Sequence, residues 1–304
     1  MQPFKIHILG CGSALPTAKH NPSSQIVEIR GKLFMVDCGE GTQLQIRKSR
    51  LNFSKLYAVF ISHLHGDHVL GLVGMLSTFG LNGRTAPLNI YAPGEYEELL
   101  RMELKMFCSN LDYEIIFHPI DTRKQQIIYE DRSLTVDTIP LHHRMPCAGF
   151  LFREKPGDRH IRRDMIDFYG VPVSQINNIK AGMDWTNSEG ETIPNALLTS
   201  DHDPQRAYAY CSDTRYMPSL AEKVKGVDLL YHESTYTEEF HDRAEKYLHS
   251  TAREAALTAR DANVGKLLLG HFSKRFLDEK PLLDEARAVF PNSFLAKEGL
   301  VMDV

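Results

Sequence analysis

The sequence predicts a layered α/β fold of the α+β type, and three observations lead to this class. Short apolar runs bounded by Gly, Pro and Asn recur along the chain and have the length and composition of strands. Helix-like segments lie between them, so that strands are followed by helices in each of two halves. The pattern breaks between residues 153 and 197, which favours one domain over residues 1–304 with an inserted arm.

The individual elements follow from these runs in chain order. Strands are expected first at residues 4–10, 25–31, 32–37, 56–62, 87–93, 125–130 and 133–141. The arm at 153–197 alternates charged residues, Gly and Pro, with little periodic apolar content. Strand-like runs return at 207–213, 227–234 and 266–273, and TAREAALTARDAN at 251–263 is typical of a helix.

Composition and termini restrict the class of protein. A formal net charge of −4 means that a nucleic-acid partner would need local basic patches. RKSR at 47–50 and RHIRR at 159–163 are candidates, although charge patterning alone favours a solvated helix face for each. The N-terminal MQPFKIHILG has no features of a signal peptide and no apolar run is long enough to cross a membrane, so we expect a cytoplasmic protein without a membrane partner. The five cysteines are widely spaced and form no CxxC motif, which argues against disulfides and a thiolate zinc site.

Polar side chains follow four of the predicted strands at the points where these strands end. The densest group is ISHLHGDH at 61–68, directly after the apolar run LYAVFI. Loops at strand ends are where a rigid sheet can hold distant side chains at a common point. We therefore expect one constellation of five histidines and two aspartates. Its members are His63, His65, Asp67, His68, His143, Asp213 and His271.

This set of donors predicts a metal site. A single histidine is more often a core or surface residue, but the HxHxDH spacing directly after a strand is typical of metal binding. Imidazole nitrogens and carboxylate oxygens suit catalytic zinc, and seven donors fit two ions that share a carboxylate and a water or hydroxide. Such a site makes hydroxide available near neutral pH and clamps oxygens around a phosphorus or carbonyl centre, which predicts a hydrolase.

Several motifs together give the chain a resemblance to a known family. ILGCGSALPTAKHNPSSQ, MVDCGEGTQLQI and ISHLHGDH are followed by HHRMPCAGF, CSDTR, HESTY, LHST and GHFSKRF, so the similarity spans nearly the whole chain. The HxHxDH motif resembles the metallo-β-lactamase superfamily, and the later motifs resemble the ribonuclease Z family of tRNA 3′-processing endonucleases. The resemblance implies an αββα sandwich with an inserted flexible arm. It also implies a zinc-dependent endoribonuclease that removes the 3′ trailer of precursor tRNA and leaves a 3′-hydroxyl on the tRNA.

The resemblance assigns roles to the site residues. His63, His65 and His143 would hold one zinc, Asp67, His68 and His271 a second, and Asp213 would bridge the two, with Mn or Mg possible in vitro. His143 is preferred to His142 as the ligand, because its spacing in sequence to Gly149 and Phe150 is the spacing that the family has between its ligand histidine and this Gly-Phe pair. Asp67 would also accept a proton from the attacking water. His249 would assist the departing ribose oxygen, with Glu233 either as its orienting catalytic partner or as a structural carboxylate.

The resemblance also places the substrate. The arm at 153–197 corresponds to an exosite that grips the body of tRNA, although VSQ follows GVP where the family carries Gly-Pro. The family commonly forms homodimers, so a homodimer is expected. The residues expected to bind RNA are Arg159, Arg162, Arg163, Lys180 and Arg275.

Rival functions share the HxHxDH motif. The nearest is a phosphodiesterase of the same fold that acts on cyclic nucleotides or other small phosphodiesters, which would have no use for a basic arm. A glyoxalase-like thioester hydrolase and a β-lactamase would also explain the motif, but a β-lactamase usually needs export. A noncatalytic RNA-binding module that keeps metals for folding would not need Asp67 or His249 for any turnover.

Overall fold

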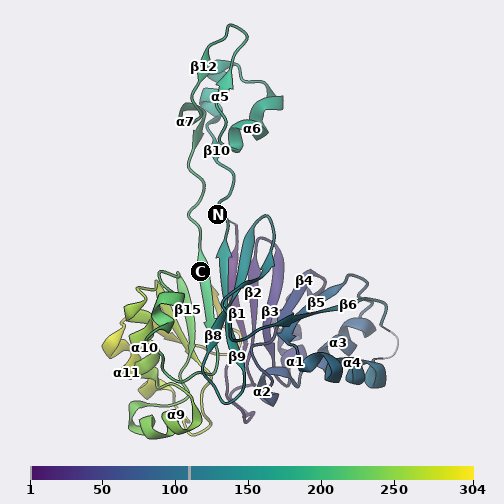
Figure 1. Ribbon diagram of the computed structural model, residues 1–304, viewed down its shortest axis with the longest axis vertical. Coiled ribbons are helices and arrows are strands. Elements are labelled where there is room, and N and C mark those ends of the chain that lie inside the picture. The colour runs from purple at the N-terminus through teal and green to yellow at the C-terminus, as the bar shows by residue number, and fades with distance from the viewer. Residues whose placement is uncertain (1, 109–110) are drawn as a thin grey trace. The chain divides into compact units, whose positions relative to one another are not determined.

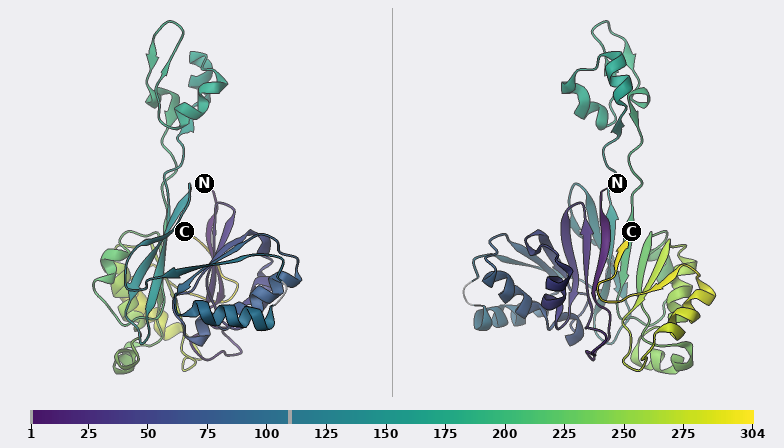
Figure 2. Two further views of the ribbon diagram at one scale, coloured as in Figure 1. Left: turned by 45° about the vertical axis from the view of Figure 1, so that its right-hand side comes forward. Right: turned by 180° about the vertical axis from the view of Figure 1, so that it is seen from behind.

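Two seven-stranded sheets lie face to face in the computed structural model, which describes residues 2–108 and 111–304 (Figure 1). They belong to the larger of two compact units, formed by residues 2–130, 135–153 and 206–304. The first sheet has the order β18-β1-β2-β3-β4-β5-β6 and the second β17-β16-β15-β14-β9-β8-β7. Helices cover the outer face of each sheet, as the two turned views also show (Figure 2). The layers are therefore αββα, as predicted.

The strand bounds agree with most of the expected runs. In the first sheet they are β1 Phe4–Gly10, β2 Ser24–Ile29, β3 Lys32–Cys38, β4 Leu56–Phe60, β5 Leu88–Pro93, β6 Ile115–Ile120 and β18 Val301–Asp303. In the second they are β7 Ile127–Glu130, β8 Leu134–Leu141, β9 Cys147–Glu154, β14 Ala207–Cys211, β15 Leu229–Glu233, β16 Lys266–Gly270 and β17 Ser293–Leu295.

Helices of the larger unit form the two outer layers. The α-helices are α1 Thr42–Ser49, α2 Gly66–Val69, α3 Leu72–Leu81, α4 Tyr96–Phe107, α8 Leu220–Lys223, α9 His241–Tyr247, α10 Ala252–Asp261 and α11 Lys280–Val289. The 3-10 helices are η1 Phe53–Lys55 and η3 Glu238–Phe240. The helix predicted at 251–263 begins at a full capping box, in which Thr251 and Glu254 satisfy each other's backbone N–H groups, so its boundary is set by the sequence itself.

An aromatic layer fills the space between the sheets. Phe34 of β3 and Phe60 of β4 face Phe150 and Phe152 of β9, with ring centroids 5.4–6.0 Å apart across the two sheets. All four side chains are fully buried. Each such ring removes a large apolar area from water, so this layer stabilises the packing of one sheet on the other.

Four strands of the two large sheets were not predicted: β6, β9, β17 and β18. The β9 sequence CAGFLFRE contains Gly149, which weakens strand propensity. The fold needs that glycine, because a Cβ at position 149 would lie 2.3 Å from the carbonyl oxygen of Tyr210 on β14. β6 contains Pro119 and lies at a sheet edge, and β17 and β18 have only three residues each, too few for a period-2 pattern.

The second compact unit comprises residues 131–134 and 154–205 and has its own small core. Its buried residues are Ile166, Val171, Ile179, Ile193 and Leu198. It extends beyond the expected end of the arm at 197, because β13 returns to pair with β10. The elements are β10 His160–Ile161, α5 Arg163–Tyr169, η2 Val173–Gln175, α6 Ile176–Lys180, β11 Trp185–Thr186, β12 Thr192–Ile193, α7 Asn195–Leu198 and β13 Thr199–Ser200.

Two further expectations concern cysteines and membranes. All five cysteines lie in the described residues and are free, and four of them are buried, as expected of reduced core residues. In the described part of the chain, no helix has the length and hydrophobicity required to span a bilayer.

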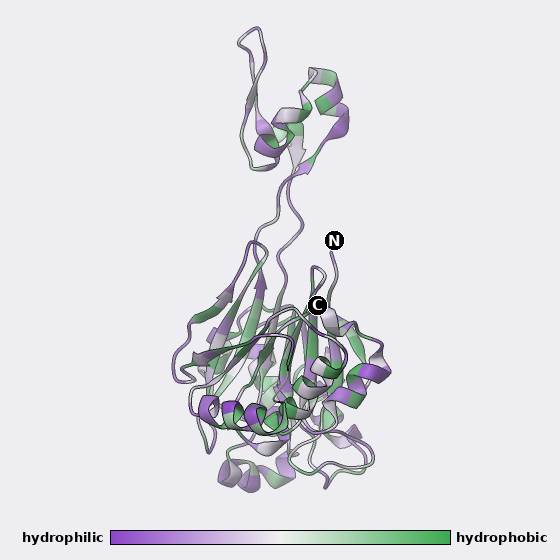
Figure 3. Cartoon of the chain, turned by 90° about the vertical axis from the view of Figure 1, so that its right-hand side faces the viewer, coloured by the Kyte–Doolittle hydropathy of each residue, from purple (hydrophilic) through white to green (hydrophobic). Residues whose placement is uncertain are grey.

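Figure 3, viewed from the side of α3 and α4, shows hydrophobic and hydrophilic residues mixed along these outer helices.

Candidate metal centre

The predicted site residues come together where strands of both sheets end. In the second sheet β14, β15 and β16 are parallel, so Asp213, Glu233 and His271 lie at the same edge. In the first sheet β3 and β4 are also parallel, which brings Asp37 next to the loop that carries His63. Parallel strand ends thus supply the common point that the sequence suggested.

His63, His65 and His143 form one group of nitrogen donors. Nδ1 of His65 lies 3.0 Å from Nε2 of His63 and 3.2 Å from Nε2 of His143. The other ring nitrogens of His63 and His143 are held by the protein: Nδ1 of His63 lies 3.0 Å from Oγ of Ser62, and Nδ1 of His143 donates to the carbonyl oxygen of Leu248 over 2.9 Å. The Nε2 atoms therefore present lone pairs to a common point, as metal ligands do.

Asp67, His68 and His271 form a second group. Oδ2 of Asp67 lies 3.3 Å from Nε2 of His68 and 3.4 Å from Nε2 of His271. His271 has a φ of 59°, a left-handed conformation that is strained for a histidine and that aims its ring at the group. All three side chains are nearly inaccessible to solvent.

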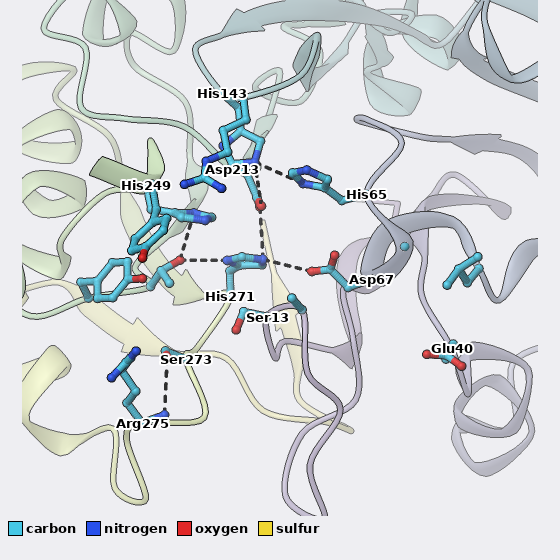
Figure 4. A pocket seen from close by; sticks show the side chains of 17 residues that line it. Ser13, Glu40, His65, Asp67, His143, Asp213, His249, His271, Ser273 and Arg275 are labelled. Atoms are coloured by element: carbon cyan, nitrogen blue, oxygen red, sulfur yellow. Dashed lines mark hydrogen bonds and ion pairs between the residues drawn. The ribbon is translucent and has the colours of Figure 1, made fainter. Parts of the chain in front are cut away.

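Asp213 lies between the two groups and faces each with a different oxygen. Oδ2 lies 3.7 Å from Nε2 of His63 and of His143. Oδ1 lies 3.2 Å from Nε2 of His271 and 3.5 Å from Nε2 of His68. Figure 4 shows Asp213 between His143, drawn above it, and His271, drawn below it, with His65 and Asp67 both to its right. One carboxylate is therefore within reach of both groups.

Asp37 holds His68 from behind. Its carboxylate is fully buried and accepts hydrogen bonds from Nδ1 of His68 at 2.7 Å, from the hydroxyl of Tyr210 at 2.7 Å and from the hydroxyl of Ser62 at 2.9 Å. Asp37 was not among the site residues predicted from the sequence. The signal was nevertheless present, because Asp37 is a polar residue at the end of a buried strand, like the ligands themselves.

A second buried carboxylate, Glu233, supports the other half of the site. Its Oε1 accepts a hydrogen bond from Nδ1 of His249 at 2.9 Å, and its Oε2 accepts one from the hydroxyl of Thr235 at 2.6 Å. Because the Thr235 hydroxyl proton goes to Glu233, Oγ1 is free to accept from Nδ1 of His271 at 2.9 Å. Glu233 thereby orients two imidazoles, and Thr235 is a link that the sequence did not reveal.

Protonation states follow from burial and from neighbouring charges. Burial alone would raise the pKa of Asp67 and Asp213, but the surrounding histidines lower both pKa values below the usual range, so both carboxylates are ionised. Burial lowers the pKa of His63, His65 and His143, which favours the neutral imidazole needed for coordination.

These donors fit a cation. Burial would lower the pKa of His68, but Asp213, Asp37 and Asp67 raise it, so the surrounding carboxylates favour a positive charge at this point. Nε2 of His68 is buried and has no hydrogen-bond partner in the described structure. A divalent ion between the groups would supply the charge and bind this nitrogen, since imidazole and carboxylate donors suit such ions.

The site opens into a pocket of about 520 Å³ that contains more than the predicted ligands. His249 lies in its wall, with its ring 5.0 Å from that of His143 and 5.4 Å from that of His271. Arg275 also lines the pocket, two residues beyond Ser273 (Figure 4). The lining residues that sequence reasoning did not identify include Ser13, Glu40, Arg144, Tyr236 and Tyr247.

Known proteins match this chain over all or part of its length. Residues 4–166 match the family model described as Anti-Pycsar protein Apyc1. The curated protein "Ribonuclease Z" of Bacteroides fragilis strain YCH46 is 57% identical over 304 residues, which is 100% of this chain and 100% of that protein. "Ribonuclease Z" of Porphyromonas gingivalis strain W83 is 47% identical, again over 100% of both chains.

The chain belongs to the ribonuclease Z family. It is therefore an endoribonuclease, a class of hydrolase, as the motifs predicted. Solved structures agree on the fold: human tRNase Z, short form, superposes with a TM-score of 0.71 at 22% identity and covers 98% of both chains. The metallo-β-lactamase fold protein YhfI of Bacillus subtilis superposes with a TM-score of 0.69 at 21% identity, over 99% of this chain and 100% of that one.

The predicted RNA-binding residues of the ribonuclease Z arm differ in their surroundings within the second unit. Nε of Arg159 donates to Thr199 Oγ1 at 2.7 Å, and its guanidinium pairs with Asp201 at 2.9 Å. Arg162 and Arg163 are exposed, and Lys180 is half-buried at the end of α6. The arm residues are thus not equally available to a ligand.

Proposed function

We propose that this chain removes the 3′ trailer of precursor tRNA by hydrolysing the phosphodiester after the discriminator nucleotide, leaving a 3′-hydroxyl on the tRNA. The observation that carries the proposal is the clustering of seven histidine and aspartate side chains, five of which line one pocket together with His249, in a chain whose whole length matches relatives named ribonuclease Z. The proposed cofactor is two zinc ions per chain, with Mn or Mg able to replace zinc in vitro.

The proposed ligand sets follow the two groups of donors. His63, His65 and His143 would hold one ion, Asp67, His68 and His271 would hold the other, and Asp213 would serve both. When bound, the ions supply activation of water and neutralise charge on the phosphodiester. The lowered pKa of Asp67 keeps this carboxylate ionised, and its position at the pocket wall suits it to accept the proton of the attacking water.

His249 is the proposed proton donor to the departing 3′-oxygen of the tRNA. Burial would lower its pKa, but the buried carboxylate of Glu233 raises it to about 9, so the imidazole is charged near neutral pH. Because Nδ1 is engaged by Glu233, Nε2 is the nitrogen available to the substrate. Glu233 is absent from the pocket wall and acts through His249, which makes it a positioning residue in this scheme.

The arm is proposed as the exosite for the body of tRNA. Residues 154–205 carry nine acidic and five basic side chains, so attraction to RNA cannot come from the charge of the whole unit. The exposed Arg162 and Arg163, with Lys180, are the proposed phosphate contacts. Arg159 is occupied by Asp201 and Thr199, and its proposed role is to hold the base of the arm together. Arg275 is proposed to bind RNA at the pocket itself.

We also propose a homodimer that uses the outer faces of α2 and α4. Leu99, Met102 and Met106 lie on one face of α4 and are 50–69% exposed, and Leu70 beside α2 is 63% exposed. An apolar groove of about 160 Å³ joins Leu70 to Leu99. A second copy would cover this surface. Sedimentation of the wild type and of Met102→Lys tests this: a monomeric wild type would contradict it.

The proposed location is the cytoplasm, because the proposed substrate is precursor tRNA. The decisive experiment is incubation of the metal-replete protein with a 3′-extended precursor tRNA and, separately, with bis(p-nitrophenyl) phosphate. Cleavage just after the discriminator nucleotide is expected. Hydrolysis of the small phosphodiester without any cleavage of precursor tRNA would instead support a small-phosphodiester hydrolase.

A further inference from the structure

The pocket contains a guanidinium to which the ligand set assigns no role. Arg144 directly follows His143 and lines the pocket, and its side chain is exposed. Among the described residues, no carboxylate pairs with Arg144 and no acceptor takes a hydrogen bond from its side chain. Because the guanidinium of Arg144 makes no hydrogen bond or ion pair with the described residues, all its N–H donors are available to a ligand that enters the pocket.

The side chain of Tyr247 holds this guanidinium in place. Cζ of Arg144 lies 4.7 Å from the centroid of the Tyr247 ring, within the range of a cation–π contact. Tyr247 is half-buried at the end of α9 and also lines the pocket. Stacking on a fixed ring restricts the rotamers of Arg144 before any ligand binds, so less conformational entropy is lost on binding.

The position of Arg144 and Tyr247 relative to His249 indicates on which side of the scissile bond they would contact the RNA. Tyr247 lies two residues before His249, and Arg144 adjoins His143, whose ring is 5.0 Å from that of His249. A proton donor to the departing 3′-oxygen must lie on the tRNA side of the scissile bond. Arg144 and Tyr247 line the same pocket as His249. Arg275 lies beyond His271, away from His143 (Figure 4).

We propose that Arg144, held by the ring of Tyr247, binds the phosphate on the 5′ side of the discriminator nucleotide, one nucleotide upstream of the scissile bond. The inference rests on the proposed function, because the direction comes from the role of His249. A planar guanidinium matches the two free oxygens of a phosphodiester and forms charge-assisted hydrogen bonds with them. The contact would fix the discriminator nucleotide relative to the metal centre and thereby help to define the cleavage point.

The test combines Arg144→Ala with a neutral phosphate in the substrate. Precursor tRNA is prepared with a methylphosphonate at one of two linkages: 5′ of the discriminator nucleotide, or one linkage inside the trailer. The sugar next to each of these linkages carries a 2′-O-methyl group in every substrate, and the substrate with normal phosphates is called unmodified. On unmodified RNA, Arg144→Ala should lower kcat/KM by about 10- to 100-fold, the usual range for a hydrogen bond to a charged group. The wild type should lose a similar factor on the 5′-modified RNA.

Coupling between Arg144→Ala and the methylphosphonate decides whether Arg144 contacts the phosphate 5′ of the discriminator nucleotide. If Arg144 contacts that phosphate, Arg144→Ala should lose almost nothing further on the 5′-modified RNA, whereas the losses should multiply on the trailer-modified RNA. The slope of log kcat/KM against log salt should become shallower by about 0.7 in Arg144→Ala, the value for one phosphate of a single strand. Losses that multiply on the 5′-modified RNA, or an unchanged kcat/KM in Arg144→Ala, would overturn the proposal.

Matched variants separate this contact from general electrostatics. Lys246 lies 5.7 Å from the same ring but is not among the pocket residues, so Lys246→Ala should stay within about twofold of the wild type. Tyr247→Phe should behave like the wild type, and Tyr247→Leu should lose activity only while Arg144 is present. A further loss from Tyr247→Leu in the Arg144→Ala background would contradict its positioning role.

Failure of the proposed function gives a different result. In that case the wild type would not cleave unmodified precursor tRNA after the discriminator nucleotide at all. If only the present inference is wrong, the wild type cleaves normally and the coupling is absent. Bound metal should be unchanged in Arg144→Ala in either case, because Arg144 is not among the proposed metal ligands.

Discussion

Nδ1 of His68 donates a hydrogen bond to Oδ2 of Asp37 over 2.7 Å, and both side chains are fully buried. The contact fixes the tautomer of His68 and turns Nε2 toward Asp67, Asp213 and the centre of the site. Asp37 has a φ of 57°, so it carries this role in a backbone conformation that few residues other than Gly, Asn and Asp adopt readily. This left-handed conformation therefore occurs at a position that orients a proposed metal ligand.

Asp37→Asn should weaken metal binding without preventing folding. Asn tolerates the left-handed conformation, but its amide lacks the negative charge that strengthens the bond from His68. The usual cost of losing such a partner is about 10- to 100-fold in metal affinity, which competition with a chelator measures. Tyr210→Phe is the control, because it removes another donor to Asp37 and leaves His68 paired. Equal effects of the two variants would mean that Asp37 serves packing only.

Asp213→Ala should disturb both metal positions together. The two oxygens of Asp213 face different histidine groups, so the substitution removes one donor from each. The purified wild type should contain close to two zinc equivalents per chain and the variant clearly less than one per site. The assay is elemental analysis after dialysis. Full two-metal occupancy in Asp213→Ala would exclude the shared carboxylate.

His249→Ala should separate chemistry from binding. A general acid acts mainly in the transition state, so the single-turnover rate on precursor tRNA should fall by about two to four orders of magnitude. Metal content and tRNA affinity should hardly change. Glu233→Gln should lower the rate less, because the amide oxygen can still accept the bond from Nδ1 of His249 but does not raise its pKa. An unaltered rate in His249→Ala would remove this residue from the mechanism.

The clustering of the proposed metal ligands was predictable because each group of them follows a strand signal. Parallel strands end at one edge, so a polar residue after each apolar run, such as Asp213 after AYAYCS, predicts a shared site without knowledge of the register. Asp37 has the same signal but was not recognised as part of the site. A carboxylate's hydrogen-bond partners 25 and 31 residues away leave no local pattern in the sequence.

The remaining features depend on contacts between segments that are distant in sequence. Thr235 joins Glu233 to His271, and Arg144 meets Tyr247, only after the second sheet has assembled. The arm was recognised by its lack of periodicity. Its small core was not recognised, because the apolar residues Ile166, Ile179 and Leu198 are too widely spaced to form one helical or strand pattern.

A buried cluster around His20 should make stability depend on pH. Nε2 of His20 pairs with Glu279 at 3.1 Å and Nδ1 with Glu298 at 3.0 Å, so both ring nitrogens face carboxylates. Cys11 is the other titratable group beside the ring, and burial raises the pKa of its thiol far enough to keep it neutral. Burial would lower the pKa of His20, but Glu298 and Glu279 raise it above its usual value.

The sign follows from the raised pKa. A group whose pKa is higher in the folded state stabilises the fold fully below its unfolded pKa, about 6.5, and this contribution is lost as pH rises through the folded value. The wild type should therefore be more stable than His20→Gln by about 2 kcal/mol at pH 6, with a smaller difference at pH 9. Denaturant unfolding of both proteins at the two pH values gives the comparison. A difference that stays constant with pH would assign His20 a packing role alone.

The arm is best tested by charge rather than by deletion. Ile193 and Leu198 belong to the core of the second unit, so a deletion that ends before them would expose apolar side chains and confuse misfolding with lost RNA binding. Arg162→Gln combined with Arg163→Gln removes two exposed charges and leaves that core intact. Precursor tRNA binding should weaken, and its salt dependence should become shallower by about 1.8, as expected for two phosphates of duplex RNA if it behaves like B-DNA.

Arg159→Gln provides the contrast within the same unit. Arg159 is occupied by Asp201 and Thr199, so its removal should loosen the pairing of β10 with β13, measured by hydrogen exchange, while the salt slope changes little. None of these variants should alter the hydrolysis of bis(p-nitrophenyl) phosphate, because a small substrate does not need a distant phosphate contact. If the Arg162 and Arg163 double variant binds and cleaves precursor tRNA as the wild type does, these arginines are ordinary surface residues. A larger change in the salt dependence of precursor tRNA binding from Arg159→Gln than from the double variant would place the RNA contact at the base of the arm.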